Sequence, residues 1–415
     1  MSERTRRLSC RLPILLLAGL LMTRPGLSAD TGKNPPKEAK KPAAEAKEDV
    51  KKDVARSPQQ AKPKQAPAAV PQVKAEPGMA DASKDPDFVF QGEFVGRLPA
   101  EGPQDQRIAL QIRPSGGGNF EALQYRGGLP GEPSSGKQAI SLVGKRWERF
   151  LVLSGGPWAV FVEPDHCVLL DRQGTRVGRL QRVLRQSPTL GARPPKDAIV
   201  LFDGKDTRQF TTARMTSDGL LMEGADMRPM FQDFNLHLEF MLPYLPAAKE
   251  QGRGNSGVYL QSRYEVQILD SFAQEPTYNG CGSLYKFRKP DVNTCFPPLV
   301  WQTYDVVFTA PRWAADGVKL RSARVSVWMN GVKVHNNVEL ADKTGAGKPE
   351  EPVLLPIRLQ DHHNPVRFRN IWLVDRGAAL PVDFPAKAAP AAKPAPKPAP
   401  AAKPAGKRSP EPKKP

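Results

Sequence analysis

Tyr264-Glu265-Val266-Gln267-Ile268-Leu269-Asp270 is the stretch from which the fold of this chain is read most directly. Side chains of a β-strand point alternately to opposite faces, so Glu265 and Gln267 share one face. Val266 and Ile268 share the other face, which must be buried in an apolar core. We therefore expect a half-buried strand that presents an acid and an amide on the side open to solvent or ligand.

Runs of the same kind lie on both sides of this stretch, and they are too short and too often interrupted to be helices. Asn330-Gly331 separates two of them, and an Asn-Gly pair tolerates the positive φ values of a tight hairpin turn. We therefore predict that residues 197–376 form an all-β sandwich of two curved antiparallel sheets. The main expected strands are Phe234–Leu242, Ser256–Gln261, Tyr264–Leu269, Tyr304–Thr309, Arg324–Met329, Val332–Val334, Ile357–Gln360 and Val366–Val374.

Residues 86–190 show a similar pattern on a smaller scale, with short apolar or alternating runs separated by Gly, Pro and Asp. This pattern predicts a small β-rich domain ahead of the sandwich. Gly116-Gly117-Gly118 falls between two such runs and not before a long helix, so we interpret it as a turn and not as a phosphate-binding loop. Because no paired carboxylates form a recognisable motif here, we interpret the region as an accessory domain.

The N-terminus has the layout of a secretory signal peptide. Arginines precede the apolar run Leu12–Met22, and Leu27-Ser28-Ala29 follows it, which predicts cleavage after Ala29. The apolar run is about half as long as the roughly 20 residues that a membrane-spanning helix needs. We therefore expect residues 1–29 to be removed, and the protein to be exported to the periplasm or the extracellular space without a transmembrane helix.

Residues 30–85 and 377–415 are dominated by Lys, Ala, Pro and Glu and have almost no aromatic or β-branched residues. Such segments cannot bury enough apolar surface to offset chain entropy, so we expect both to be disordered. Together with the signal peptide they carry most of the formal net charge of +18, which therefore says little about the folded part. The basic tails suit association with an anionic envelope polymer, but they contain no nucleic-acid-binding signature with interleaved aromatic residues.

Three cysteines remain after removal of the signal peptide: Cys167, Cys281 and Cys295. In an oxidising compartment Cys281 and Cys295 are close enough in sequence to close one loop with a disulfide, which is our prediction. A metal site is the alternative, but no second Cys or His stands nearby at zinc-finger spacing. Cys167 is then an odd thiol that we expect to be buried.

Several short motifs follow one another in the region of the predicted sandwich, and the set is far more specific than any one of them. The motifs are Ile199–Lys205, Gly254–Tyr259, Tyr264–Asp270, Gly282–Tyr285, Trp301–Asp305, Asn330-Gly331, Leu359–His362 and Phe368–Ile371. Taken together they resemble the 3-keto-disaccharide hydrolase family. One departure from the family pattern is His363, which follows His362 where a Gly is usual and so replaces a residue that tolerates any φ.

The resemblance implies a concanavalin-like jelly-roll sandwich and a substrate with a ketone at C3 of a glycosyl unit. That ketone makes the C2 hydrogen acidic, so a base can remove it, the C1 leaving group can depart, and water can add to the unsaturated product. For this chemistry we predict Glu265, His362 and Asp270 as catalytic residues. The predicted substrate-binding residues are Asn255, Gln267, Gln360, Arg369 and Asn370.

Alternation supports part of this set without the resemblance, because Gln360 and His362 share one strand face while Leu359 points away. We therefore predict that Glu265, Gln267, Gln360, His362 and Arg369 line one pocket.

Three alternatives stay open at this stage. No cofactor is expected, although a divalent metal ion can replace Arg369 as the electrophile. A two-carboxylate glycosidase mechanism would pair Glu265 with Asp270 or Glu239. A non-catalytic carbohydrate-binding or envelope-associated module is the reading from a different functional class, since a fold does not fix a function.

Overall fold

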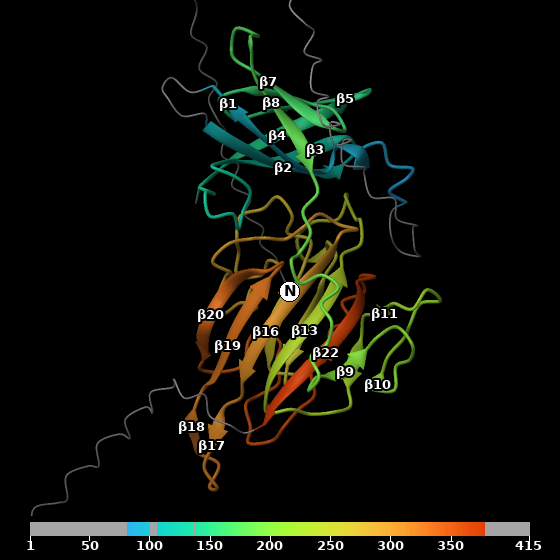
Figure 1. Cartoon of the computed structure of the whole chain (residues 1–415), viewed down its shortest axis with the longest axis vertical. Helices are drawn as coiled ribbons and strands as arrows, with labels where there is room; N and C mark the ends of the chain where they lie inside the picture. The colour runs from blue at the N-terminus through green and yellow to red at the C-terminus, as the bar shows by residue number, and fades with distance from the viewer. Residues whose placement is uncertain (1–80, 100–105, 137, 378–415) are drawn as a thin grey trace, which may run out of the picture. The chain divides into compact units, whose positions relative to one another are not determined.

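The computed structural model describes residues 81–99, 106–136 and 138–377, and its regular structure within these ranges is β-strand apart from two short 3-10 helices (Figure 1). The strands form an N-terminal barrel and a C-terminal sandwich, which confirms the predicted all-β fold. The predicted signal peptide, the linker up to residue 80 and the tail from residue 378 lie outside the described residues. Residues 81–85 differ from the expected disorder, because they form turns and bury Ala82.

Within the described ranges, no helix has the length and apolar character that crossing a membrane requires.

The strands that lie between residues 92 and 183 form a closed antiparallel barrel. Strand β1 (Gly92–Leu98) pairs with both β2 (Gln106–Gly116) and β8 (Arg176–Val183), and this double pairing closes the barrel. One apolar cluster fills the interior. Gly117 and Gly118 form the turn between β2 and the next strand, and both have positive φ, as does Gly116 at the end of β2, which confirms the predicted turn. The other elements are η1 (Phe88–Phe90), β3 (Asn119–Arg126), β4 (Ala139–Trp147), β5 (Phe150–Ser154), β6 (Ala159–Val162) and β7 (His166–Leu170).

The C-terminal sandwich consists of two antiparallel sheets. The five-stranded sheet has the order β10 (Phe210–Thr212), β12 (Ala225–Met227), β21 (Arg358–Leu359), β14 (Ser256–Leu260) and β15 (Tyr264–Ile268). The seven-stranded sheet has the order β11 (Leu221–Met222), β22 (Arg367–Gly377), β13 (Asp233–Met241), β16 (Trp301–Thr309), β19 (Ala323–Met329) and β20 (Val332–Leu340), and β9 (Ile199–Phe202) also pairs with β22. The remaining elements are η2 (Glu250–Gly252) and a two-stranded ribbon of β17 (Arg312–Trp313) and β18 (Lys319–Arg321).

One apolar cluster joins the inner faces of both sheets. The five-stranded sheet contributes Val258, Val266 and Leu359, and the seven-stranded sheet contributes Leu236 and Val306, among others. Burial of each such side chain stabilises the fold by about 1.5–3 kcal/mol, so the alternation of apolar residues fixes which face of each strand points inward. The polar residues between them are left on the outer faces.

Candidate active site on the five-stranded sheet

The outer face of the five-stranded sheet carries polar side chains from its neighbouring strands. Strands β14 and β15 pair so that Tyr259 lies opposite Glu265, and Gly257 lies opposite Gln267. Tyr259 also lies opposite Arg358 of β21. Directly opposite residues of an antiparallel pair project from the same face, so these side chains form one surface away from the core.

A pocket of about 360 Å³ includes this surface. Five of the residues selected from the sequence line it, and of these Asn255, Glu265 and Gln267 are almost fully buried. Gln360 is half-buried, and His362 is exposed. The other lining residues are Gln251, Tyr259, Tyr285, Lys286, Gly345 and Ala346.

Glu265 is the only acidic residue among the described residues that line this pocket. Its side chain is 1% exposed, and burial raises its pKa from 4.5 to about 7, while hydrogen bonding to Tyr259 and the positive charge of Lys286 oppose the rise. A carboxyl group that titrates near neutral pH can accept a proton from a substrate and return it. The burial of this carboxyl therefore gives the pocket its one strong candidate for a general base.

A chain of amide side chains lies in the same pocket. Gln251 Oε1 accepts hydrogen bonds from Asn255 Nδ2 at 3.2 Å and from Gln267 Nε2 at 3.1 Å. Asn255 Nδ2 also donates to the Gln251 carbonyl oxygen at 2.8 Å. These bonds fix the orientation of all three amides before any ligand arrives.

Three buried oxygen atoms in the pocket have no hydrogen-bond partner among the described residues: Glu265 Oε2, Asn255 Oδ1 and Gln360 Oε1. The amide nitrogen of Gln360 is engaged, because it donates to the Tyr259 hydroxyl at 3.3 Å. A buried polar atom without a partner costs about 1–3 kcal/mol. The three acceptors therefore suit a ligand with several donor groups, such as the hydroxyls of a sugar.

Tyr285 and Lys286 are pocket residues that the sequence reasoning missed. Lys286 adopts a φ of +58°, a left-handed conformation that a non-glycine residue rarely takes. Its Nζ lies 5.4 Å from the centroid of the Tyr285 ring. Gly345 packs against the same ring, since a Cβ at this position would lie 2.4 Å from Tyr285 Cδ1. The one available signal was the aromatic residue at the end of the motif Gly282–Tyr285.

Asp270 was predicted to be catalytic, but it does not line the pocket. Its buried carboxylate accepts a hydrogen bond from Arg253 Nε at 2.6 Å, and Phe272 N donates to its other oxygen at 3.3 Å. The same guanidinium donates to the Pro246 carbonyl oxygen at 2.8 Å. The ion pair holds this carboxylate outside the pocket, so the geometry favours a role for Asp270 in anchoring the segment that leads into β14 over the predicted catalytic role.

Arg369 and Asn370 were predicted to bind substrate in the same pocket, but they lie on the other sheet. Both belong to β22 and contact Glu239 of β13, through Arg369 Nε at 2.7 Å and Asn370 Nδ2 at 2.9 Å. The Arg369 guanidinium also lies 4.0 Å from the centroid of the Trp301 ring. Glu239 is therefore not a partner for Glu265 across one sugar ring. Since Asp270 is enclosed elsewhere, the two-carboxylate mechanism loses both of its candidate pairs.

Cys281 and Cys295, predicted to be linked, are buried free thiols in the structure. Cys281 Sγ lies 3.3 Å from the Tyr304 hydroxyl oxygen, and Cys295 Sγ lies 3.4 Å from the Phe296 carbonyl oxygen. The two thiols also hydrogen-bond to each other, so they are direct neighbours in the core, and their oxidation to a disulfide stays a prediction. Cys167 is a buried free thiol inside the barrel, as expected.

Comparisons with known proteins bear on the sandwich. Residues 197–374 match the family of 3-keto-alpha-glucoside-1,2-lyase-like domains. A crystal structure of a candidate glycosyl hydrolase from Parabacteroides distasonis shares 35% sequence identity, covering 44% of this chain and 84% of that one, with a TM-score of 0.41. A second candidate glycosyl hydrolase from the same organism shares 16% identity over 46% and 98% of the two chains, with a TM-score of 0.34. No curated protein matches the chain.

Proposed function

Because residues 197–374 belong to the 3-keto-alpha-glucoside-1,2-lyase-like domain family, we propose that the pocket on their five-stranded sheet cleaves 3-keto-glycosides. The cleavage is an elimination followed by addition of water, so the net reaction is hydrolysis. The observation that carries the proposal is the buried carboxyl of Glu265, whose pKa of about 7 suits a base at neutral pH. The predicted signal peptide would place this activity in the periplasm or outside the cell.

The elimination starts at the C2–H bond, which the C3 ketone makes acidic. The carboxylate of Glu265 takes the C2 proton, and the electron pair of that bond forms an enolate with its charge on the C3 oxygen. The C1–O bond then breaks as a C1=C2 double bond forms and the ketone is restored, and the departing oxygen takes a proton. Water adds across the double bond to give the free 3-keto-sugar.

The other pocket residues have roles that follow from their chemistry. The ammonium group of Lys286 stabilises the enolate oxygen, as a fixed positive charge does where negative charge develops. The unpartnered oxygens of Asn255 and Gln360 accept hydrogen bonds from sugar hydroxyls. Tyr285 offers a ring for the apolar face of the sugar. The exposed His362 donates the proton to the departing oxygen.

Lys286 also bears on the metal alternative. Glu265, Asn255 and Gln360 offer oxygen atoms of the kind that hard divalent cations bind. However, the Lys286 charge acts on the Glu265 carboxyl, and two cations at one carboxylate repel each other. We therefore propose that Lys286 supplies the electrophile and that turnover needs no cofactor.

A non-catalytic sugar-binding module is the second candidate, because the unpartnered oxygens of the pocket favour any ligand rich in hydroxyls. The deciding experiment incubates the purified protein with a 3-keto-disaccharide and with its unoxidised parent, with and without a chelator. We expect consumption of the keto-sugar alone, a transient enone absorbance, and no effect of the chelator. Binding of both sugars without any product would support the module instead.

The pKa of Glu265 predicts the pH dependence of turnover. Because the carboxyl must be ionised to take a proton, kcat/KM should rise with pH and level off above about 7 instead of above 4.5. Lys286→Met removes a charge that lowers this pKa, so the rise should move to higher pH. Initial rates across the pH range measure both effects. A rise near pH 4.5 in both proteins would mean that an exposed acid is the base.

Gly257 is expected to be required for the position of the base. A Cβ at this position would lie 2.4 Å from Glu265 Oε1, closer than real Cβ atoms approach. The Gly257→Ala variant should therefore displace the carboxylate and lower kcat roughly tenfold to a hundredfold, the scale of an ångström-sized misplacement. Gly174→Ala is the control, because its Cβ would meet nothing within 4 Å and its φ of +81° strains the backbone at a turn that does not line the pocket, so it shows whether strain elsewhere lowers kcat. Equal kcat in both variants would show that the carboxylate need not lie there.

A further inference from the structure

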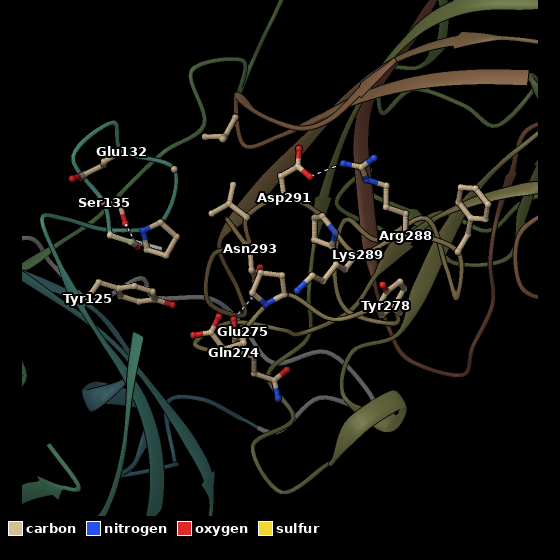
Figure 2. A pocket seen from close by; sticks show the side chains of 18 residues that line it. Tyr125, Glu132, Ser135, Gln274, Glu275, Tyr278, Arg288, Lys289, Asp291 and Asn293 are labelled. Carbon is tan, nitrogen blue, oxygen red and sulfur yellow. Dashed lines mark hydrogen bonds and ion pairs between the residues drawn. The ribbon is translucent and has the colours of Figure 1, made fainter. Parts of the chain in front are cut away.

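A second pocket, of about 840 Å³, shares no lining residue with the candidate active site (Figure 2). Its lining comes from residues 274–293 and Val332 of the sandwich, and from residues 125–136, which include the end of β3 and the segment after it. Residues 125–136 pack closely against the sandwich, because a Cβ at Gly131 would lie 2.8 Å from Val332 Cγ2 and 3.0 Å from Thr294 Cγ2. The pocket is therefore enclosed by segments that pack against each other, and its volume is more than twice that of the catalytic pocket.

Two aromatic rings in this pocket are unusually exposed. Tyr278 is 57% exposed and Phe287 is 40% exposed. Figure 2 shows Tyr278 and Tyr125 with Glu275 and Lys289 between them. Exposed aromatic rings beside polar groups mark a binding surface, and the flat C–H face of a sugar ring is a ligand that uses both.

The charges of the pocket favour a neutral ligand. Arg288 is paired with Asp291 at 2.8 Å, and Glu132 is paired at 2.5 Å with Arg107, which lies outside the lining. The other two charged lining residues, Glu275 and Lys289, have opposite signs. An anionic polymer would meet the acidic groups as well as the basic ones, whereas sugar hydroxyls can both donate to acids and accept from bases.

We propose that this pocket is a second binding site for a neutral oligosaccharide, separate from the catalytic pocket. This inference rests on the proposed function, because it assumes that the catalytic pocket holds one glycosyl unit of a longer oligosaccharide. One loop serves both places: Tyr285 and Lys286 line the catalytic pocket, and residues 287–289 line the second. A glycan held here raises the local concentration of its reactive end at the catalytic pocket.

The test uses the full chain and unoxidised maltohexaose and cellohexaose, titrated separately by calorimetry. These probes lack the C3 ketone that elimination needs, so binding is measured without turnover. Tyr278→Ala should weaken binding of at least one probe by about tenfold or more, a difference of about 1.4 kcal/mol. Trp147→Ala is the matched control, because this aromatic side chain is 74% exposed and lines neither pocket. Both variants should turn over a 3-keto-disaccharide within about twofold of the wild-type rate.

The proposal is wrong if the wild type binds neither probe, or if Tyr278→Ala binds both probes as tightly as the wild type does. It is also wrong if Tyr285→Ala loses binding while Tyr278→Ala keeps it, or if the wild type retains only an anionic polysaccharide. Loss of binding in Tyr285→Ala alone would place the sugar in the catalytic pocket. Normal probe binding by a protein that turns over no 3-keto-glycoside would contradict the proposed function and leave this inference standing.

Discussion

Glu265→Gln is expected to lower turnover of a 3-keto-glycoside at least about a hundredfold, the usual scale for the loss of a positioned base. The amide has nearly the same shape as the carboxyl group and fits in its place next to Gly257, but it cannot take the C2 proton. The measurement is kcat on a 3-keto-disaccharide with the folded variant. Glu339→Gln is the matched control, because this exposed glutamate of β20 does not line the pocket. Wild-type turnover in folded Glu265→Gln would remove this residue from the mechanism.

Stability provides an independent readout for the same variant. The pKa of Glu265 is about 7 in the folded protein and 4.5 in its unperturbed state, so folding favours the protonated form. Wild-type stability should therefore fall as pH rises from about 4.5 to about 7, by up to about 3 kcal/mol. Glu265→Gln has no such loss, so urea unfolding should find it more stable than the wild type at pH 8 but not at pH 4. The opposite order at pH 8 would mean that the protein stabilises the ionised carboxylate.

Strand alternation identified much of the pocket because a two-residue period is a local property of the chain. Alternation places Glu265 and Gln267 on one face of the strand and Val266 on the other, and the structure has the first two side chains on the outer face of β15. The same rule applies to Arg369, which also faces away from the core, but β22 pairs with β13 in the other sheet. Which sheet a strand joins depends on packing far away in the sequence, and the pattern of one strand does not contain it.

The missed residues have a different cause. Tyr285 and Lys286 lie in a turn, where no period sorts side chains by face, and the positive φ of Lys286 is a conformation that its residue type does not predict. Gln251 lies in the short helix η2, for the same reason outside any alternation. The closure of the barrel could not be predicted from local patterns either, because it depends on pairing between β1 and β8, the first and last strands of the domain. Local patterns therefore gave the fold class and one wall of the pocket, but not its loops.

Asp270→Asn is expected to lower the free energy of unfolding by about 3–5 kcal/mol, the cost of removing one partner of a buried ion pair. The guanidinium of Arg253 is 3% exposed, and without Asp270 its charge is left buried opposite an uncharged amide. Because this pair anchors the segment that carries Gln251 and Asn255, KM should rise while kcat of the folded fraction stays within about twofold of wild type. Chemical denaturation and steady-state kinetics measure the two effects separately.

The double variant Arg253→Met with Asp270→Leu distinguishes an anchor from a catalytic acid. Replacing both charges with apolar side chains of similar volume leaves no unpaired group, so it should recover much of the stability lost in Asp270→Asn. If the pair is structural, the effects of the Arg253 and Asp270 substitutions on the free energy of unfolding should be strongly non-additive, while kcat should change little in either the single or the double variant. A kcat that falls a hundredfold in Asp270→Asn with unchanged stability, and does not recover in the double variant, would mean that the carboxylate reaches the substrate. That result would require Arg253 to release it, which the 2.6 Å contact in a site closed to solvent argues against.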